Sequence, residues 1–126
     1  MTGPKPLKIK IQLYCGDEIA MGPGKADLLD AIARHGSISA AARALGMSYR
    51  RAWLLVDAMN RCWRDPLVET SPGSTGGGGA RVSELGREVL GRYRGLQAGV
   101  ARAGDSADFA SLHRAMLPGP RRSQKE

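Results

Sequence analysis

A segment with several arginines and no acidic residue is the clearest sign in this sequence of a binding function. Between Asp30 and Asp57 the chain carries no acidic residue. The arginines in that interval are Arg34, Arg43, Arg50 and Arg51. A surface that only keeps a protein in solution intersperses the two signs of charge. The whole chain has 19 basic and 12 acidic residues, a net charge of +7 and a pI near 10.0. We therefore expect a polyanionic partner, nucleic acid first and an anionic membrane surface second.

A second stretch, SPGSTGGGGARVS at residues 71–83, contains four consecutive glycines. Such a run is either the phosphate cradle of a nucleotide-binding enzyme or the tip of a hairpin. A Walker-type loop needs a Lys-Ser/Thr pair at the start of a helix directly after its glycines. A dinucleotide-binding loop likewise opens directly onto a helix. Here an extended run, Ala80-Arg81-Val82, follows instead, so the sequence favours the hairpin tip.

Other signs of catalysis or metal binding are weak. His35 and His113 have no nucleophile and acid at the spacing of a known motif. Cys15 and Cys62 are far apart in sequence, and neither lies near a histidine at the spacing of a metal site. We expect no enzyme, no metal and no cofactor, and two reduced structural cysteines. Redox or metal sensing by these thiols is the alternative.

Length and composition predict one globular domain in the cytoplasm. The 126 residues are 42% hydrophobic and 25% charged, which is ordinary for a folded domain. A membrane span takes about 20 consecutive apolar residues, and no such run is present. The N-terminal MTGPKPLKIKIQ lacks the apolar centre of a signal peptide. We expect no membrane association.

The chain falls into segments whose apolar periods alternate between strand and helix. LKIKIQLY (7–14) alternates at every second residue and predicts the first strand of a hairpin over residues 7–21. Helical spacing follows over 25–35, and Ser37 or Ser39 can cap a short helix over 40–45. Gly46 ends that helix, and Ser48 caps a third through about residue 63. Further elements are expected as two short strands (67–70 and 80–82) around the glycines, a long helix (83–103) capped by Ser83, a short helix (107–117) and a disordered basic tail.

A short helix, a glycine turn and a longer helix in this order form a helix-turn-helix. In that motif the N-terminal residues of the second helix contact base edges in the major groove. Ser48, Tyr49, Arg50 and Arg51 occupy those positions, and Arg43 is a weaker candidate for a backbone contact. The hairpin that follows would be the wing of a winged helix. The alternative is an ordinary helical pair whose arginines form a solvated face.

Several segments resemble the N-terminal domain of the molybdate-responsive (ModE-type) transcriptional regulators, which is related to the LysR-type winged helix. They are IQLYCGDE (11–18), GSISAAARALGMSYRRAW (36–53), DAMN (57–60), PLVE (66–69) and GGGGARVSELG (76–86). The resemblance implies a homodimer on an inverted-repeat operator, held by the N-terminal strand region and the helix after the wing. Full-length members add oxyanion-binding repeats, which these 126 residues lack, so we do not expect direct molybdate sensing.

The predicted fold is mainly α with a small β component: a winged helix-turn-helix with an N-terminal β-hairpin and a long C-terminal dimerisation helix. We expect a DNA-binding domain over 1–104 (helix-turn-helix 38–63, wing 66–82) and a short helix with a tail over 105–126. The expected function is sequence-specific transcriptional regulation on double-stranded DNA. A non-specific architectural protein and an interaction partner of a full-length related regulator are the alternatives. Expected wing contacts are Ser74, Thr75, Gly76, Gly77, Gly78, Gly79 and Arg81, and expected dimer contacts are Leu85, Val89, Tyr93, Leu96 and Val100.

Overall fold

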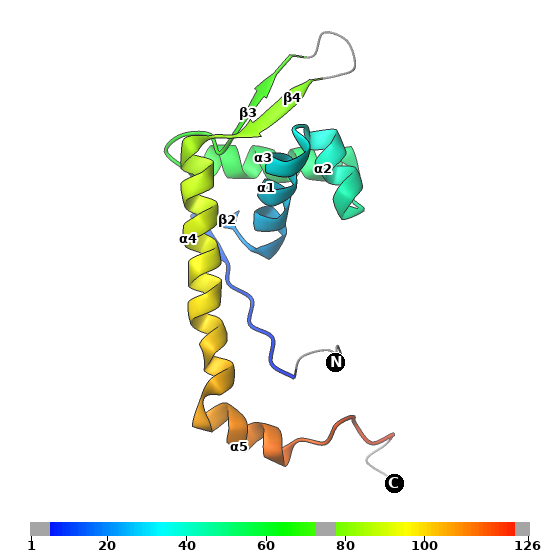
Figure 1. Cartoon of the computed structure of the whole chain (residues 1–126), viewed down its shortest axis with the longest axis vertical. Coiled ribbons are helices and arrows are strands. Elements are labelled where there is room, and N and C mark those ends of the chain that lie inside the picture. The colour runs from blue at the N-terminus through cyan, green and yellow to red at the C-terminus, as the bar shows by residue number, and fades with distance from the viewer. Residues whose placement is uncertain (1–5, 73–77, 123–126) are drawn as a thin grey trace.

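The computed structural model describes residues 6–72 and 78–122. It consists of a head of three helices (residues 23–62), two β-hairpins and a long projecting helix (Figure 1). The helices are α1 (Pro23–His35), α2 (Ile38–Leu45), α3 (Tyr49–Cys62), α4 (Glu84–Ala101), the 3-10 turn η1 (Arg102–Asp105) and α5 (Ala107–Ala115). The strands are β1 (Leu13–Cys15), β2 (Glu18–Met21), β3 (Val68–Ser71) and β4 (Gly79–Val82). This arrangement confirms the predicted α+β winged helix with its long C-terminal helix.

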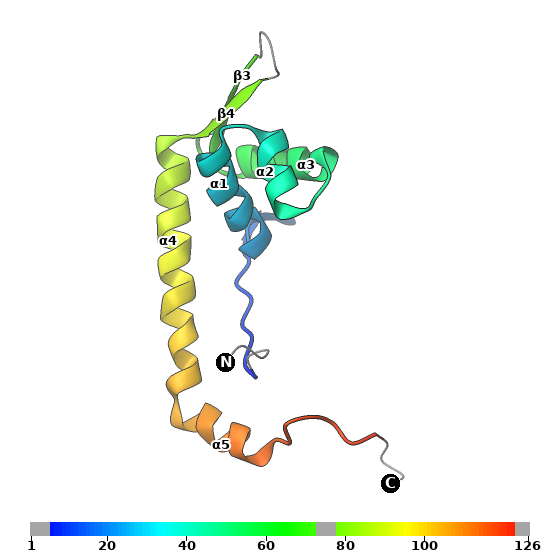
Figure 2. The same cartoon turned by 45° about the vertical axis from the view of Figure 1, so that its right-hand side comes forward.

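The hydrophobic core lies where the three head helices meet the base of the wing and the first turns of α4. The helix α2 contributes the buried Ala41 and Ala42. The largest fully buried side chains come from β2, α1, α3, α4 and the start of the wing: Met21, Leu28, Leu29, Ile32, Met59, Leu67, Val68 and Tyr93. Beyond the head, α4 continues as a projecting rod, and α5 turns away at its far end (Figure 2). The core therefore fixes the helix-turn-helix and the wing in one unit.

The predicted N-terminal strand is wrong over residues 7–12. The paired strand β1 begins only at Leu13, because its partner β2 has four residues and Gly22 then caps α1. Residues 7–12 run instead as an extended segment beside α4 (Figure 1). The Tyr93 hydroxyl donates a 2.7 Å hydrogen bond to the Ile11 carbonyl, and Leu7 lies beside Gly104. The segment thus packs on a helix instead of pairing with a strand.

Ion pairs join the projecting helix to the head. Arg94 of α4 contacts Asp27 at 2.9 Å and Asp30 at 3.1 Å, both on α1. The hydrogen bond to Asp27 raises the pKa of Arg94 above its ordinary value, and the bond to Asp30 adds to the effect. These pairs and the Tyr93 hydrogen bond set the direction in which α4 leaves the head.

Candidate nucleic-acid interface

The turn between α2 and α3 has the features that the sequence predicts for a helix-turn-helix. Gly46 takes φ 70°, a left-handed conformation that side chains disfavour, and it ends α2. Ser37 rather than Ser39 caps α2, since its hydroxyl accepts from Ala40 N at 3.0 Å. Ser48 caps α3 in the same way by accepting from Arg51 N at 3.1 Å. The Ser48 hydroxyl keeps its own proton to donate to a ligand.

The two faces of α3 differ sharply. Ala52, Val56, Ala58 and Met59 are buried against the head, as the apolar period predicts. Tyr49, Arg50 and Arg51 lie exposed on the first turn of the helix. The structure therefore brings these predicted contact residues together on a surface that an external partner can reach.

Three arginines of this surface have side chains without a bonding partner among the described residues. Within the described ranges, the side chains of Arg43, Arg50 and Arg51 make no hydrogen bond or ion pair with the protein. By contrast, Arg61 pairs with Asp57 on the same helix at 2.9 Å, and that hydrogen bond raises its pKa. Unpaired guanidinium groups keep all five donors for phosphate oxygens or guanine edges.

The wing is a two-stranded antiparallel hairpin of β3 and β4, as predicted. Strand β4 is docked to the end of α1 by a 2.9 Å hydrogen bond from Ala80 N to the Gly36 carbonyl. Arg81 lies opposite Glu69 and bonds it through Nε at 2.9 Å, so only its terminal amino groups remain for a phosphate. Gly78 is exposed and Gly79 begins β4. The other four wing residues of the prediction, Ser74, Thr75, Gly76 and Gly77, lie outside the described residues.

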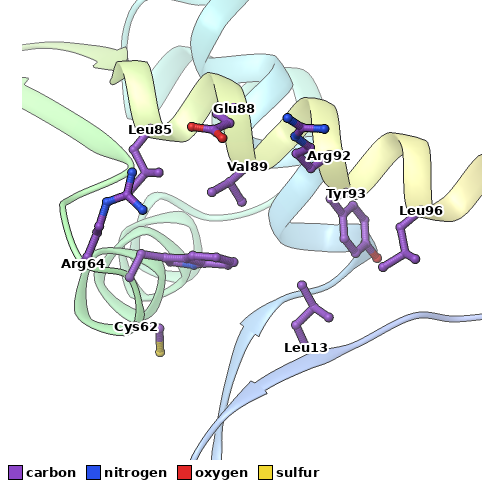
Figure 3. Close-up of a pocket in the computed structure, with 10 residues that line it drawn as sticks. Leu13, Cys62, Arg64, Leu85, Glu88, Val89, Arg92, Tyr93 and Leu96 are labelled. Atoms are coloured by element: carbon purple, nitrogen blue, oxygen red, sulfur yellow. The ribbon is translucent and has the colours of Figure 1, made fainter.

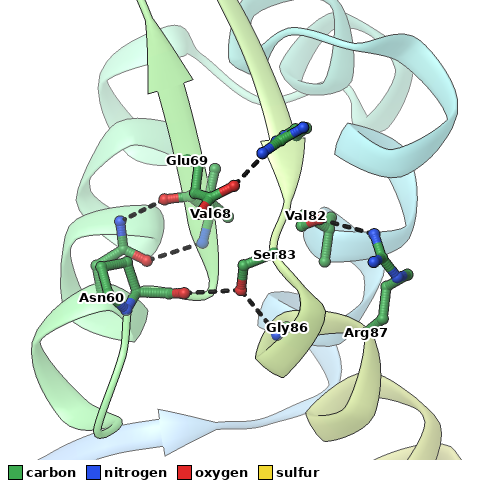
Figure 4. Close-up of polar contacts among 9 residues, drawn as sticks. Asn60, Val68, Glu69, Val82, Ser83, Gly86 and Arg87 are labelled. Carbon is green, nitrogen blue, oxygen red and sulfur yellow. Dashed lines mark hydrogen bonds and ion pairs between the residues drawn. The ribbon is translucent and has the colours of Figure 1, made fainter.

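A set of side-chain hydrogen bonds that the sequence did not predict joins α3 to the wing (Figure 4). The Asn60 carbonyl oxygen accepts from Leu67 N at 2.9 Å and Val68 N at 3.0 Å, and its amide donates to the Val68 carbonyl at 3.0 Å. Ser83 adds a second link, since it caps α4 at Gly86 N and donates to the Pro66 carbonyl at 2.7 Å. Asn60 is part of the DAMN motif, but sequence spacing alone does not show what it binds.

Two large apolar residues of α3 were not among the predicted contact residues. Trp53 and Leu54 are each 47% exposed, on the outward side of the helix. The signal was available, since neither residue falls on the apolar face formed by Ala52, Leu55, Val56 and Met59. These residues extend the exposed surface from the first turn of α3 to the second.

The five predicted dimer residues of α4 do not share one environment. Val89 and Tyr93 are 8% and 2% exposed and belong to the core of the single chain. Buried side chains offer a partner little surface, so a role in a dimer stays only a prediction for these two residues. Leu85 and Val100 are half-buried, and Leu96 is 45% exposed. Leu85 and Leu96 line an apolar cavity of about 450 Å³ between α4, the end of α3 and β1 (Figure 3).

The fold brings the two cysteines together, although 46 residues separate them in sequence. Both are free thiols, with Cys15 exposed and Cys62 partly buried. Trp63, next to Cys62, donates from its indole nitrogen to the Ala20 carbonyl of β2 at 3.1 Å. Burial raises the pKa of the Cys62 thiol, and a hydrogen bond with the Cys15 thiol raises it further. Across the described ranges, no group of three or more metal-ligating side chains comes together.

The described residues contain no helix with the length and apolar character needed to cross a membrane. Residues 25–87, which run from α1 into α4, match the bacterial regulatory helix-turn-helix proteins of the LysR family.

Three curated relatives are similar to this chain over 82 to 99 residues. The chain is 38% identical to the molybdenum-pterin-binding protein MopA of Rhodobacter capsulatus over 99 residues. This alignment covers 79% of this chain and 37% of MopA. The chain is 46% identical over 82 residues to MopB of the same organism, which is 65% of this chain and 30% of MopB. It is 35% identical over 86 residues to the DNA-binding transcriptional dual regulator ModE of Escherichia coli, which is 68% of this chain and 33% of ModE.

The chain spans about a third of the length of these curated relatives. The comparisons confirm the resemblance that the sequence motifs indicate. The matched span includes the capped turn, the exposed arginines and the wing described above. The chain therefore belongs to the LysR-type family of bacterial regulatory helix-turn-helix proteins, a family of DNA-binding regulators.

Proposed function

We propose that this protein is a sequence-specific transcriptional regulator that binds an inverted-repeat operator as a homodimer. The observation that carries the proposal is the exposed first turn of α3, where Arg50 and Arg51 have no partner in the described part of the chain. Such a turn can donate hydrogen bonds to base edges and phosphates at the same time. Binding to bacterial DNA would place the protein in the cytoplasm.

The proposed contacts divide into two groups. Tyr49 and Arg50 enter the major groove, where arginine can bond guanine through two hydrogen bonds. Ser48, Arg51 and Arg43 flank them and contact phosphates. The wing residues Ser74, Thr75, Gly76, Gly77, Gly78, Gly79 and Arg81 contact the backbone or the minor groove beside them. The net charge of +7 supports the phosphate contacts, since these supply most of the non-specific affinity.

The homodimer is supported by the apolar surface that one chain leaves uncovered on α4. Leu96 is 45% exposed, and Leu85 and Val100 are half-buried. A twofold dimer of a helix-turn-helix protein binds two half-sites related by the same symmetry. We propose that these three residues, and not Val89 or Tyr93, supply the seam.

The proposal is tested by selecting binding sites from a random duplex library at near-physiological salt. We expect one inverted repeat to be recovered. Salt-sensitive binding without any recovered sequence would instead indicate an architectural protein. No binding by the protein alone, but binding after mixing with a longer relative, would indicate an interaction partner of a full-length regulator.

Two substitutions then separate base contacts from phosphate contacts. Arg50→Ala should relax the preference at one base pair by about 1–3 kcal/mol, whereas Arg51→Ala should weaken all sequences about equally and reduce the salt dependence. Arg64→Ala is the matched control, because Arg64 is an exposed arginine just beyond the other end of α3, beside Asp65. Equal effects of all three substitutions would contradict the proposed interface.

A further inference from the structure

The exposed face of α3 carries large apolar side chains as well as arginines. Trp53 and Leu54 are each 47% exposed, and Tyr49 is 55% exposed on the turn before them. Apolar surface left in water costs roughly 25 cal/mol per Å². A cluster of large apolar side chains on one exposed helix face marks a binding surface more often than a chance arrangement does.

Helical spacing makes these residues continuous with the proposed base-contact residue Arg50. Residues three and four positions apart are neighbours on a helix surface. Trp53 follows Arg50 by three positions, and Leu54 follows it by four. A helix whose first turn enters a groove therefore brings its second turn, with Trp53 and Leu54, against the next base pairs along that groove.

The two tryptophans of the chain have different roles. The Trp63 indole nitrogen donates to the Ala20 carbonyl, so this ring joins the head to β2. The Trp53 indole nitrogen has no hydrogen-bond partner among the residues that the structure describes. Trp53 thus keeps both its ring surface and its donor for an external partner, which a purely structural tryptophan does not.

The charged residues around the apolar patch of Trp53 and Leu54 indicate which kind of partner covers this patch. Arg50 and Arg51 lie on the preceding turn without partners within the described ranges. On the following turn the negative charge of Asp57 is paired with Arg61 at 2.9 Å. A nucleic acid fits a patch with such a basic border, because the phosphates flank the groove floor. On that floor, the apolar group available to a side chain is the C5 methyl of thymine.

We propose that Trp53 and Leu54 read thymine methyl groups and so select thymine at the base pairs that face the second turn of α3. This inference rests on the proposed binding of α3 in the major groove. Leu54 has no polar side-chain atom, so a methyl group is its only specific partner on a base edge. The Trp53 ring covers a neighbouring methyl.

The test uses the full chain and the operator recovered by site selection. Each thymine of one half-site is replaced in turn by deoxyuridine, which lacks the C5 methyl but pairs in the same way. We expect one or two of these replacements to weaken binding about fourfold each, the factor that corresponds to about 0.8 kcal/mol for one buried methyl-sized group. The other replacements should have little effect.

Substitutions assign each methyl to a side chain. With Leu54→Ala, the deoxyuridine at one position should no longer weaken binding further, and with Trp53→Ala the same should hold at the other position. Leu112→Ala, which removes an exposed leucine of α5, is the matched control and should leave every deoxyuridine effect unchanged. Thermal unfolding checks that each variant is folded.

The outcomes separate this inference from the proposed function. Binding that tolerates deoxyuridine everywhere, or methyl effects that persist in both variants, would overturn the inference while leaving specific DNA binding intact. Failure of the folded wild-type protein to bind any duplex would overturn both. A change of sedimentation behaviour in Trp53→Ala or Leu54→Ala without a change in DNA binding would show a protein interface instead.

Discussion

Asn60 stabilises the junction between α3 and the wing through three hydrogen bonds to the backbone of residues 67 and 68. Leu67 and Val68 are buried, so water cannot easily replace a lost partner. We expect Asn60→Ala to lower the free energy of unfolding by about 1–3 kcal/mol for each backbone group left unpaired. Asn60→Asp keeps both acceptor bonds and should cost less. Urea unfolding measures both, and equal small losses would contradict this role.

The Cys62 thiol should react slowly in the folded protein. Burial and the hydrogen bond with Cys15 raise its pKa, and only the thiolate is nucleophilic. At pH 8 we expect iodoacetamide to label Cys62 more slowly in the native protein than in denaturant. Cys15→Ala should move the pH profile of that labelling to lower pH.

Mass spectrometry of quenched samples follows the labelling at each site. Equal rates in native and denatured protein would contradict the raised pKa. Labelling of both thiols without loss of DNA binding would remove the alternative that they act as a sensor.

At the scale of elements, Gly86 allows α4 to approach the segment before β3. A Cβ at this position would collide with the Leu67 carbonyl oxygen and lie 2.6 Å from Val82 Cγ1. We expect Gly86→Ala to destabilise the protein by about 1–3 kcal/mol through overpacking. Gly91 lies on the same helix with nothing within 4 Å of such a Cβ, so Gly91→Ala should stabilise it by roughly 0.5–1 kcal/mol. Thermal unfolding should show opposite shifts, and a common direction would contradict the packing argument.

Tyr93 couples α4 to the N-terminal segment and makes stability depend on pH. Burial raises the pKa of its phenol above 10.0. The neutral form, which donates to the Ile11 carbonyl, is therefore favoured by folding. Its contribution is fully present below the unfolded pKa of about 10 and is lost as pH rises through the higher folded pKa.

Tyr93→Phe should thus lower the free energy of unfolding at pH 7 by about 1 kcal/mol, the value of one hydrogen bond. The variant should also lose less stability than the wild type between pH 9 and about pH 11. Urea unfolding at a series of pH values makes the comparison. If the free energy of unfolding of the two proteins changed in parallel with pH, the raised pKa of Tyr93 would be contradicted.

At the scale of the whole molecule, the proposed homodimer depends on the surface of α4 beyond the head. Leu96→Glu places a charge where a partner helix would bury an apolar side chain, twice in a symmetric dimer. Burial of each Leu96 side chain contributes about 1.5 kcal/mol or more to dimer stability. We therefore expect the dissociation constant of the dimer to rise by at least about 100-fold. Analytical ultracentrifugation measures this change.

Leu112→Glu is the control for the Leu96 experiment, because Leu112 is 65% exposed on α5 rather than α4. It should leave the dimer unchanged. Dissociation by Leu112→Glu alone would assign the interface to α5 instead, and a monomeric wild-type protein would contradict the proposed homodimer.

The sequence by itself determined the helices, the wing strands and the basic surface of α3, because the signals for all three are local. Caps such as Ser48 and Ser83 bond a backbone group three residues away, and Gly46 adopts its conformation within a single turn. The acid-free interval around Arg50 is equally a property of neighbouring residues. Periods of two and 3.6 residues then assigned the wing strands and the helices.

Tertiary structure alone decided which side chains meet across long separations. The period-two pattern of residues 7–12 indicated a strand, but β2 is too short to pair with it, so this segment packs on α4. One apolar stripe on α4 was divided between the core, at Tyr93, and the exposed surface, at Leu96. The contact between Cys15 and Cys62 and the hydrogen bonds of Asn60 likewise depend on where the core places whole elements. Periodicity assigns a side chain to a face of its element, whereas packing determines what that face contacts.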